Sequence, residues 1–254
     1  MKNLAIHSVF KNEASYLKEW IDYHRHVIGA DLFLLYSNNS TDNFLEVLEP
    51  YGDMIVLKDW PGPTRKLQAF QDGLDNFRHR VRWIAFIDLD EFIYSPRDLN
   101  ILDTLKGHHA VLLNWACFGN NGHQVRPPGG VIENFTRFGW GMKRDGVTPL
   151  VKTILNPRAV CKTFNVHRFV TKNKFSAPRE DWRINHYCIK SLEEFHWKRN
   201  IRGNENDSTW KIEDGDYLDR FNLNTFEDKG MLQYVARMDA GNQTPQADPG
   251  PGGV

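Results

Sequence analysis

The feature that most constrains this chain is an unbroken apolar run that ends in acidic residues. Residues 83–92 read WIAFIDLDEF, and the apolar part predicts a β-strand buried on both faces. Such strands occur in parallel sheets covered by helices, where ligands bind beyond the carboxyl ends of the strands. We therefore expect Asp88 and Asp90 to emerge at a ligand site.

The spacing of these two aspartates indicates a metal. Residues two apart on an extended backbone share a face, so the carboxylates of Asp88 and Asp90 should point the same way. Two hard oxygen ligands at the mouth of a cleft suit Mn²⁺ or Mg²⁺ carrying a phosphorylated substrate. A solvated acidic turn after a strand is the alternative interpretation of an isolated Asp-x-Asp motif.

Strand-like and helix-like patterns alternate through the first half of the chain. Strands are predicted at residues 4–10, 32–36 and 54–57, each followed by apolar residues spaced three or four apart, before the acid-tipped strand. Asn12 is predicted to cap the first helix and Gly29 to end it. This alternation predicts a doubly wound α/β fold with a mostly parallel central sheet and helices on both faces.

The second half of the sequence is less regular. Helices are predicted at residues 98–105 and 191–200, and strands at residues 110–115, 151–155 and 159–164. Because neither an internal repeat nor a linker is visible, we expect one domain over residues 1–240. The Gly- and Pro-rich residues 241–254 predict a disordered tail.

Composition excludes several classes of protein. Lys plus Arg and Asp plus Glu number 32 each in 254 residues, so no global basic field for nucleic acid is present. Three scattered cysteines without a Cys-x-x-Cys pair form neither a disulfide framework nor a zinc ribbon, and fit a reducing compartment. The first apolar run is too short for a signal peptide or a membrane span. We expect a soluble, cytoplasmic protein.

Polar residues follow three of the predicted parallel strands, and these ends meet at one edge of the sheet. We expect a nucleotide there, contacted by five residues: Lys11, Asn12, Glu13, Asn38 and Asp88. Neither a Gly-x-Gly-x-x-Gly motif nor a P-loop follows the first strand, so dinucleotide and P-loop sites are disfavoured. A metal at Asp90 would then carry the phosphates.

Two later segments add residues to this site. His186, in a strand-like segment at residues 184–187, would complete a common two-acid, one-histidine metal set with Asp88 and Asp90. A hydrogen-bonded structural histidine is the alternative. Lys198 and Arg202 lie at the C-terminal end of the helix predicted at residues 191–200, where they either complement the helix dipole or hold a departing diphosphate.

Together these motifs resemble a known family. The Lys11-Asn12-Glu13 start, the turn containing Asn38 and the DLDEF motif at residues 88–92 are similar to family 2-like glycosyltransferases of the GT-A fold. Three later motifs look like glycosyltransferase family 92 and its bacterial relatives: NWxxFGxxGH at residues 114–123, NHY at 185–187 and KSxEEFxxK at 190–198. The resemblance covers about residues 3–235. Such enzymes often carry Asp where this chain has Ser37.

The resemblance implies a GT-A-type fold and a metal-dependent enzyme, with Mn²⁺ or Mg²⁺ at Asp88, Asp90 and His186. It implies transfer of a hexose such as galactose from a nucleotide sugar, with UDP as the carrier. The acceptor would be a hydroxyl of a glycan or another molecule, and the anomeric carbon would invert. A metal-dependent phosphoesterase or nucleotidyltransferase, or a sugar-nucleotide binding module without catalysis, remains the alternative.

Inversion by single displacement requires a carboxylate that takes the acceptor proton. Glu133 is the first choice because it follows the loop at residues 118–123, which should face the acceptor. Three other acids remain open for this role: Asp145, Asp181 and Glu194. Three tryptophans either stack on sugar rings or pack in the core: Trp115, Trp140 and Trp182.

Overall fold

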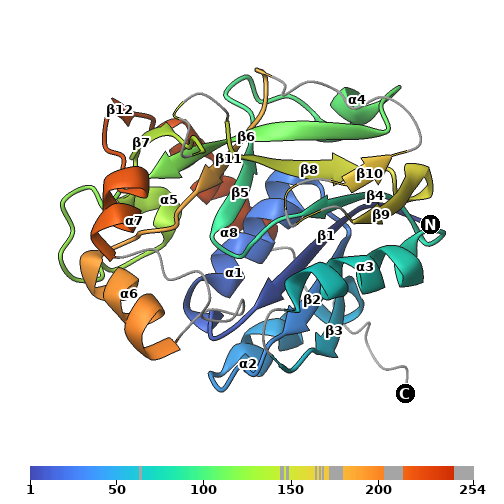
Figure 1. Ribbon diagram of the computed structural model, residues 1–254, viewed down its shortest axis with the longest axis horizontal. Coiled ribbons are helices and arrows are strands. Elements are labelled where there is room, and N and C mark those ends of the chain that lie inside the picture. The colour runs from blue at the N-terminus through green and yellow to red at the C-terminus, as the bar shows by residue number, and fades with distance from the viewer. Residues whose placement is uncertain are drawn as a thin grey trace, which may run out of the picture.

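The computed structural model has an α/β fold built on one ten-stranded mixed sheet (Figure 1). It describes residues 1–62, 65–143, 146, 149–163, 165, 167, 169–171, 180–202 and 214–242. The α/β fold class is confirmed. None of the helices in this part of the chain is both long enough and apolar enough to cross a membrane.

The first half of the sheet is parallel, as expected. Strands β1 (Lys2–Phe10), β2 (Leu32–Ser37), β3 (Ile55–Asp59) and β4 (Val81–Phe86) lie in the order β4-β1-β2-β3. Helices α1 (Ala14–Tyr23), α2 (Phe44–Leu48) and α3 (Lys66–Phe77) connect them in turn. This is the doubly wound pattern that the alternation of strands and helices predicted.

The second half of the sheet is largely antiparallel, so the sheet is mixed. Strand β8 (Val151–Leu155) lies antiparallel between β4 and β6 (Ala110–Phe118), and β7 (Arg137–Trp140) and β12 (Phe226–Glu227) extend that side. Strand β11 (Arg183–His186) pairs parallel with β6 and antiparallel with β5 (Glu91–Tyr94). Antiparallel neighbours do not need crossover helices, and it was the alternation of strands with such helices that allowed the first half to be predicted from the sequence.

The remaining elements are short. They are η1 (His24–Ile28), η2 (Glu49–Met54), α4 (Ile101–Leu105), α5 (Val131–Asn134), η3 (Pro157–Ala159), β9 (Val160–Thr163), β10 (Phe169–Thr171), α6 (Leu192–Trp197), η4 (Lys198–Arg202), α7 (Asp214–Phe221), η6 (Gly230–Tyr234) and α8 (Val235–Asn242). Helix α8 includes the first two residues of the expected tail, and residues 243–254 lie outside the described residues.

Alternate side chains of β1 divide between two cores. Leu4 and Ile6 pack with α1 and α2 on one face of the sheet, whereas Ala5 and Val9 pack with α3 on the other. All four are buried because helices cover both faces of this strand. The continuous apolar run of β1 follows from this two-sided burial.

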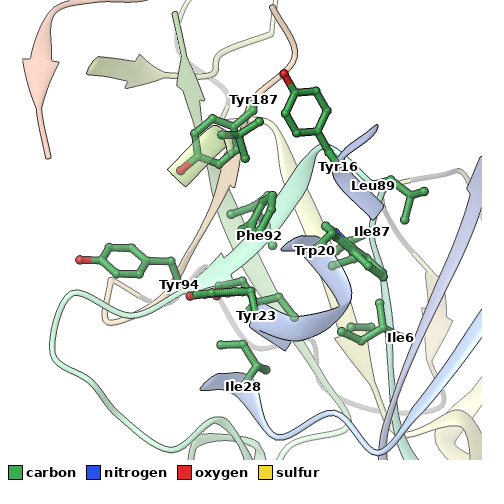
Figure 2. Close-up of a cluster of buried hydrophobic side chains, with 14 of the residues drawn as sticks. Ile6, Tyr16, Trp20, Tyr23, Ile28, Ile87, Leu89, Phe92, Tyr94 and Tyr187 are labelled. Carbon is green, nitrogen blue, oxygen red and sulfur yellow. The ribbon is translucent and has the colours of Figure 1, made fainter. Parts of the chain in front are cut away.

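Aromatic residues of α1 hold the strand that follows the acidic motif. Trp20 and Tyr23 lie beside Phe92 in the buried cluster of Figure 2. The indole Nε1–H of Trp20 donates to the Glu91 carbonyl at 2.8 Å, and the Tyr23 hydroxyl donates to the Ile93 carbonyl at 2.8 Å. Helix α1 therefore fixes the position of β5, and with it one end of the acidic loop.

The expectation that Asn12 caps α1 is wrong. Asn12 has a φ of 51°, and its Oδ1 accepts hydrogen bonds from the backbone N–H groups of Thr41 and Asp42. The carboxylate of Asp42 instead accepts from the Ala14 N–H at 2.7 Å and so satisfies the first turn of α1. Gly29 does end the helical segment, with a φ of 80°.

Helix α3 approaches β1 so closely that residue 73 has to be glycine. The His7 ring lies over Gly73, and its Nε2–H donates to the Ala69 carbonyl at 2.9 Å. A Cβ at residue 73 would overlap this ring, which is fully buried. A Cβ added at Gly215 in α7 would instead lie in open space.

These two glycines predict opposite effects of one substitution. Gly73→Ala should destabilise the protein by about 1–3 kcal/mol because the buried His7 ring must move. Gly215→Ala should be neutral or stabilise by up to about 1 kcal/mol through helix propensity. Denaturant unfolding of both variants measures the difference. Equal stability of the two variants would contradict the close packing of α3 on β1.

His24 is held in its neutral form inside the core. Its Nδ1–H donates to the Trp20 carbonyl at 2.8 Å, and its Nε2 accepts from the Ile93 N–H at 3.3 Å. Burial lowers the pKa of His24 to about 3, although the hydrogen bond to Trp20 opposes this change. A second proton would place an N–H group against the Ile93 N–H.

We predict a stability loss in mild acid from this histidine. The unfolded chain binds a proton near pH 6.5 and the folded chain near pH 3, so the free energy of unfolding decreases as pH falls below about 6.5. By pH 5 the loss from one such histidine amounts to about 2 kcal/mol. His24→Gln should unfold more easily at pH 7 but show a smaller decrease between pH 7 and pH 5. An unchanged slope would contradict the neutral buried imidazole.

Candidate functional site

A cavity of about 230 Å³ opens where β1 and β4 end. Lys11 and Glu13 after β1 line it together with Lys66 at the start of α3. Asp88 and Asp90 line it from the loop between β4 and β5. The cavity therefore lies at the edge of the sheet where the sequence predicted a ligand.

The second half of the chain closes this cavity, which we call the first cavity. Lys152 reaches it from β8 and His186 from β11, and Lys198 and Arg199 reach it from η4. In Figure 1, α6 and α7 lie at the end of the molecule toward which the arrowheads of β1 and β6 point. The antiparallel strands and the helices after them thus complete a site that the parallel strands begin.

The turn that forms the acidic loop places both aspartates at the cavity. Ile87 and Leu89 are buried in the core below the loop, so Asp88 and Asp90 point away from that core. The loop is closed by a backbone hydrogen bond from the Glu91 N–H to the Asp88 carbonyl at 3.1 Å. The predicted common direction of Asp88 and Asp90 agrees with this arrangement, since both line the cavity.

Two buried lysines hold Asp88. The Lys152 Nζ lies 2.9 Å from the Asp88 Oδ2, and Lys66 forms an ion pair with Oδ1. Burial alone would raise the pKa of Asp88, but the charges of Lys152 and Lys66 hold it well below its ordinary value. Neither lysine was recognised from the sequence, although Lys152 interrupts the apolar run VKTIL of β8, where a charge has to be paired.

Glu91 lies beneath this pair and is fully buried. One of its carboxylate oxygens accepts from the Asp88 N–H at 2.9 Å and lies 3.1 Å from the Lys152 Nζ. Burial raises the pKa of Glu91 even though Lys152 lowers it, because Asp88 and Asp90 add to the effect of burial. Lys152 therefore joins Asp88 to Glu91 and sets the position of the Asp88 carboxylate.

Asp90 is held by a histidine and a third lysine. The Lys198 Nζ lies 2.6 Å from the Asp90 Oδ2, and the His186 Nε2 lies 3.5 Å from Oδ1. Burial would raise the pKa of Asp90, but Lys198 and His186 lower it well below its ordinary value. For His186 the effects run the other way. Burial lowers its pKa, but the nearby Cys188 and Asp90 outweigh burial and raise the pKa of His186 to about 9.

Strand pairing explains why a histidine far along the chain meets Asp90. In the antiparallel pair of β11 and β5, His186 lies opposite Glu91. The next residue, Tyr187, donates its backbone N–H to the Asp90 carbonyl at 2.7 Å. The predicted association of His186 with the acidic motif thus has a geometric basis that the sequence alone does not contain.

Asp90 and His186 form a pair that fits a divalent ion. The 3.5 Å between the Asp90 Oδ1 and the His186 Nε2 allows one ion to lie about 2.0–2.2 Å from both atoms. Carboxylate and imidazole are ligands that Mn²⁺ accepts. Asp88 lies beside this pair, but each of its oxygens faces an ammonium group, so the structure groups Asp90 and His186 more closely than the three predicted ligands together.

His186 also belongs to a second group that could bind a metal. Ligand atoms of Cys117, His186 and Cys188 all lie within 4.8 Å of one another, and all three residues are buried. Thiolates favour soft ions, whereas the Asp90 side of His186 favours harder ones. His186 therefore lies between a carboxylate and two thiols.

Two of the predicted nucleotide contacts have structural partners instead. The Asn38 side-chain amide donates to the Trp60 and Gly62 carbonyls at 2.7 and 2.8 Å, and it does not line the first cavity. Asn12 holds the turn that caps α1 and also lies outside this cavity. Lys11, Glu13 and Asp88 do line it.

The position of Glu133 does not support the prediction that it is the catalytic base. Its side chain is exposed, accepts from the Gly130 N–H at 3.4 Å and lines neither the first cavity nor the larger one beside it. The acid that buries itself against α5 is Glu19, whose oxygens accept from the Val131 and Ile132 N–H groups. The place of Glu133 in the sequence, after the loop at residues 118–123, did not predict that its side chain lies outside both cavities.

The other acids considered for that role have different surroundings. Asp181 pairs with Arg97 at 2.6 Å and lies away from the first cavity. Glu194 accepts from the Tyr16 hydroxyl at 2.6 Å and, in the capping box of α6, from the N–H and hydroxyl of the N-cap residue Ser191. Asp145 and the side chain of Arg202 lie outside the described residues.

The three tryptophans surround a smaller cavity of about 180 Å³. Trp115 packs its ring 4.2 Å from that of His186 and also lines the first cavity. Trp182 is buried, and its Nε1–H donates to the Thr104 hydroxyl at 3.0 Å. Trp140 is 43% exposed. Core packing therefore accounts for Trp115 and Trp182, and Trp140 alone among the three offers an accessible ring.

The buried lysine of β8 predicts a large stability effect. Lys152→Met should destabilise the protein by about 3–5 kcal/mol, because the partly buried Asp88 and the fully buried Glu91 lose their common cationic partner. Lys58→Met is the matched control: Lys58 pairs with Asp72 at 2.8 Å, but its side chain is 41% exposed. That loss should stay within about 1 kcal/mol. Denaturant unfolding compares the two, and equal losses would contradict the role of Lys152.

Comparison with known proteins identifies the family to which the sequence motifs belong. Residues 5–222 match the profile described as glycosyltransferase family 92, which confirms the resemblance. A family 92 glycosyltransferase of Ricinus communis is 30% identical over 210 residues, covering 77% of this chain and 37% of the relative. A galactan β-1,4-galactosyltransferase of Arabidopsis thaliana is 29% identical over 96 residues, covering 34% of this chain and 18% of the relative. This chain thus spans less than half the length of these relatives.

Solved structures overlap with parts of the fold. Staphylococcus aureus TarS in complex with UDP is 16% identical, with a TM-score of 0.36, over 62% of this chain and 47% of that chain. Glucosyl-3-phosphoglycerate synthase of Mycobacterium tuberculosis with Mn²⁺ and UDP-glucose is 16% identical, with a TM-score of 0.33, over 45% of this chain and 44% of that chain. Overlaps of this size do not identify a function.

Proposed function

The chain belongs to glycosyltransferase family 92, and we propose that it transfers a hexosyl group from a UDP-linked sugar to a hydroxyl of a glycan or another acceptor. The donor would lie in the first cavity. Galactose is the hexose that the name of the Arabidopsis relative suggests. Inversion of the anomeric carbon is part of the proposal, as the family resemblance implies.

The observation that carries the proposal is the charge of the first cavity. Five cationic side chains line it: Lys11, Lys66, Lys152, Lys198 and Arg199. Three carboxylates line it: Glu13, Asp88 and Asp90. Cations remain in excess even when the buried Glu91 is added, although the chain as a whole has no net charge. A local excess of this kind suits a ligand with several negative charges, such as a diphosphate.

Asp90 and His186 would hold the Mn²⁺ or Mg²⁺ expected of such an enzyme. Their separation and donor types fit a divalent ion, with Asp88 beside them. Bound there, the ion would supply positive charge opposite the diphosphate of the donor. Because both oxygens of Asp88 face lysines, we assign Asp88 to orienting the donor rather than to direct ligation.

Lys198 is the residue best placed to hold the leaving diphosphate. Its Nζ contacts the Asp90 carboxylate within the first cavity, on the helical segment that follows α6. Negative charge on the diphosphate grows as the bond to the sugar breaks, so a cation aimed at it contributes more to the rate than to donor affinity. Arg202 is proposed for the same task from its position four residues later in η4.

The proposal predicts that donor binding depends on Asp90 and on a divalent ion. In calorimetry with UDP-galactose or UDP-glucose and Mn²⁺, Asp90→Asn and His186→Ala should each weaken binding at least about tenfold. Removing the ion with a chelator should have the same effect on the wild-type protein. The control Asp98→Asn changes a half-exposed aspartate that pairs with Arg237, and it should bind normally.

Product analysis separates this function from the alternatives. A glycosyltransferase releases UDP from the donor, and transfer to an acceptor raises the rate of that release. A phosphoesterase or nucleotidyltransferase would instead release phosphate, UMP or pyrophosphate. Binding without any turnover would indicate a module that has lost catalysis. Normal affinity of Asp90→Asn for the donor would refute the metal assignment.

A further inference from the structure

A second, larger cavity adjoins the first one. It measures about 520 Å³ and lies between the N-terminal ends of α1 and α2 on one side and helix α6, orange in Figure 1, on the other. The two cavities share three lining residues: Glu13, Cys188 and Lys198. A molecule bound in the second cavity would therefore reach the place where the donor sugar leaves its diphosphate.

We propose that the second cavity binds the acceptor as an uncharged saccharide, and that Glu13 takes the proton of its attacking hydroxyl. This inference rests on the proposed function, since it assigns the other substrate of the same reaction. It also moves Glu13 from the nucleotide contact expected from the sequence to the junction of the two substrates.

Lys198 shows how close the two substrates would lie. It contacts Asp90, one of the two residues proposed to hold the ion, and it lines both cavities. A single displacement requires the attacking oxygen and the leaving group to lie on opposite sides of one carbon. Because the two cavities share Lys198 and Glu13, they would bring the acceptor and the donor sugar next to each other.

The charges of the second cavity differ from those of the first. Four carboxylates line it, Glu13, Asp42, Glu193 and Glu194, against three cations, Arg126, Lys190 and Lys198. Asp42, Glu193 and Glu194 accept hydrogen bonds from the Ala14 N–H, the Arg126 N–H and the Tyr16 hydroxyl, respectively. This lining has no excess of cations to attract an anion. Fixed carboxylate and amide oxygens accept hydrogen bonds from hydroxyl groups, which saccharides supply.

Trp197 offers an aromatic face at the edge of the second cavity. It lies in the last turn of α6 and is 41% exposed. The Tyr16 ring in the same cavity is covered by charged groups, with the Lys190 Nζ 4.1 Å and the Arg126 guanidinium 4.5 Å from its centre. Trp197 is thus the accessible ring, and the apolar C–H face of a pyranose packs on such rings.

Among the described carboxylates, Glu13 alone lines both cavities. Asp88 and Asp90 line only the first. Glu13 follows β1, and one of its oxygens lies 3.5 Å from the Lys190 Nζ. Lys190 is itself buried, with a left-handed backbone at φ 59°, so the partner that positions Glu13 is fixed.

The chemical step balances with these residues. The acceptor oxygen forms a bond to the anomeric carbon while the bond from that carbon to the phosphate oxygen breaks. The electron pair of the broken bond stays on the diphosphate, which Lys198 faces. The proton of the acceptor hydroxyl passes to the Glu13 carboxylate.

The experiment measures UDP release from UDP-galactose and UDP-glucose, first alone and then with defined oligosaccharides. The neutral probes are the tetrasaccharides of β-1,4-linked galactose, glucose and xylose, and the acidic probe is tetragalacturonate. We expect a neutral probe to accelerate UDP release. Trp197→Ala should raise the KM for that probe about tenfold, the loss of roughly one stacking contact. Its affinity for UDP should not change, because Trp197 does not line the first cavity.

Trp140→Ala is the matched control. Trp140 is a tryptophan of nearly equal exposure in the smaller cavity, which shares only Trp115 with the first cavity. The control should leave the KM for the probe unchanged. A rise in KM for Trp140→Ala, with Trp197→Ala normal, would overturn the assignment of the acceptor to the second cavity.

Glu13→Gln tests the proton acceptor. The kcat for transfer should fall about a hundred- to ten-thousand-fold, with the affinity for UDP and the KM for the probe near normal. The acidic limb of the pH–rate profile should be lost, and Glu13→Asp should recover part of the rate. Weaker UDP binding with an unchanged kcat would overturn the role as a base and return Glu13 to the nucleotide.

Failure of the inference is distinguishable from failure of the proposed function. If wild-type protein neither binds nor cleaves either UDP-sugar, the proposed function is wrong and the inference falls with it. If it cleaves a donor but only tetragalacturonate, or no probe, accelerates the release of UDP, the assignment of a neutral saccharide is wrong while the donor site stands.

Discussion

Neutralisation of the buried acids Asp90 and Glu91 and of the partly buried Asp88 is the interaction on which the rest of this structure depends. Asp88, Asp90 and Glu91 occupy one short loop, and taking a carboxylate out of water costs several kcal/mol unless a partner offsets it. The partners are the lysines of three separate elements: Lys66 of α3, Lys152 of β8 and Lys198 of η4. The acidic loop can be buried only when all three elements have packed around it.

Because of this requirement, the antiparallel half of the sheet is part of the candidate site. Strand β8 lies against β4 and brings Lys152 under the acidic loop, and β11 lies against β5 and brings His186 beside Asp90. The parallel half supplies the loop, and the antiparallel half supplies its charges and its histidine. The family 92 profile spans both halves of the chain, and residues of both halves line the first cavity.

Local patterns predicted what depends on local physics. Because β1 and β4 are buried on both faces, the sequence shows them as continuous apolar runs. Asp88 and Asp90 both line the first cavity, but the loop that carries them is a turn and not the extended backbone that the prediction assumed. Long-range pairing was not predictable in this way. The cap of α1 comes from Asp42 in another turn, and Lys152 has its partner Asp88 in the loop after the neighbouring strand β4. Glu133 lies outside both cavities because of how distant segments pack, and this packing could not be predicted from a single sequence.

If the proposed ion and donor bind as assigned, the contact between Lys198 and Asp90 would couple them. An ion that binds Asp90 competes with an ammonium group already 2.6 Å from this carboxylate, so by itself it gains little. The diphosphate of the proposed donor would offer the displaced ammonium a new anionic partner. Each ligand would then strengthen the binding of the other, and by linkage the effect would be equal in both directions. On this proposal, Lys198 is an internal counterion that would make the two ligands bind cooperatively.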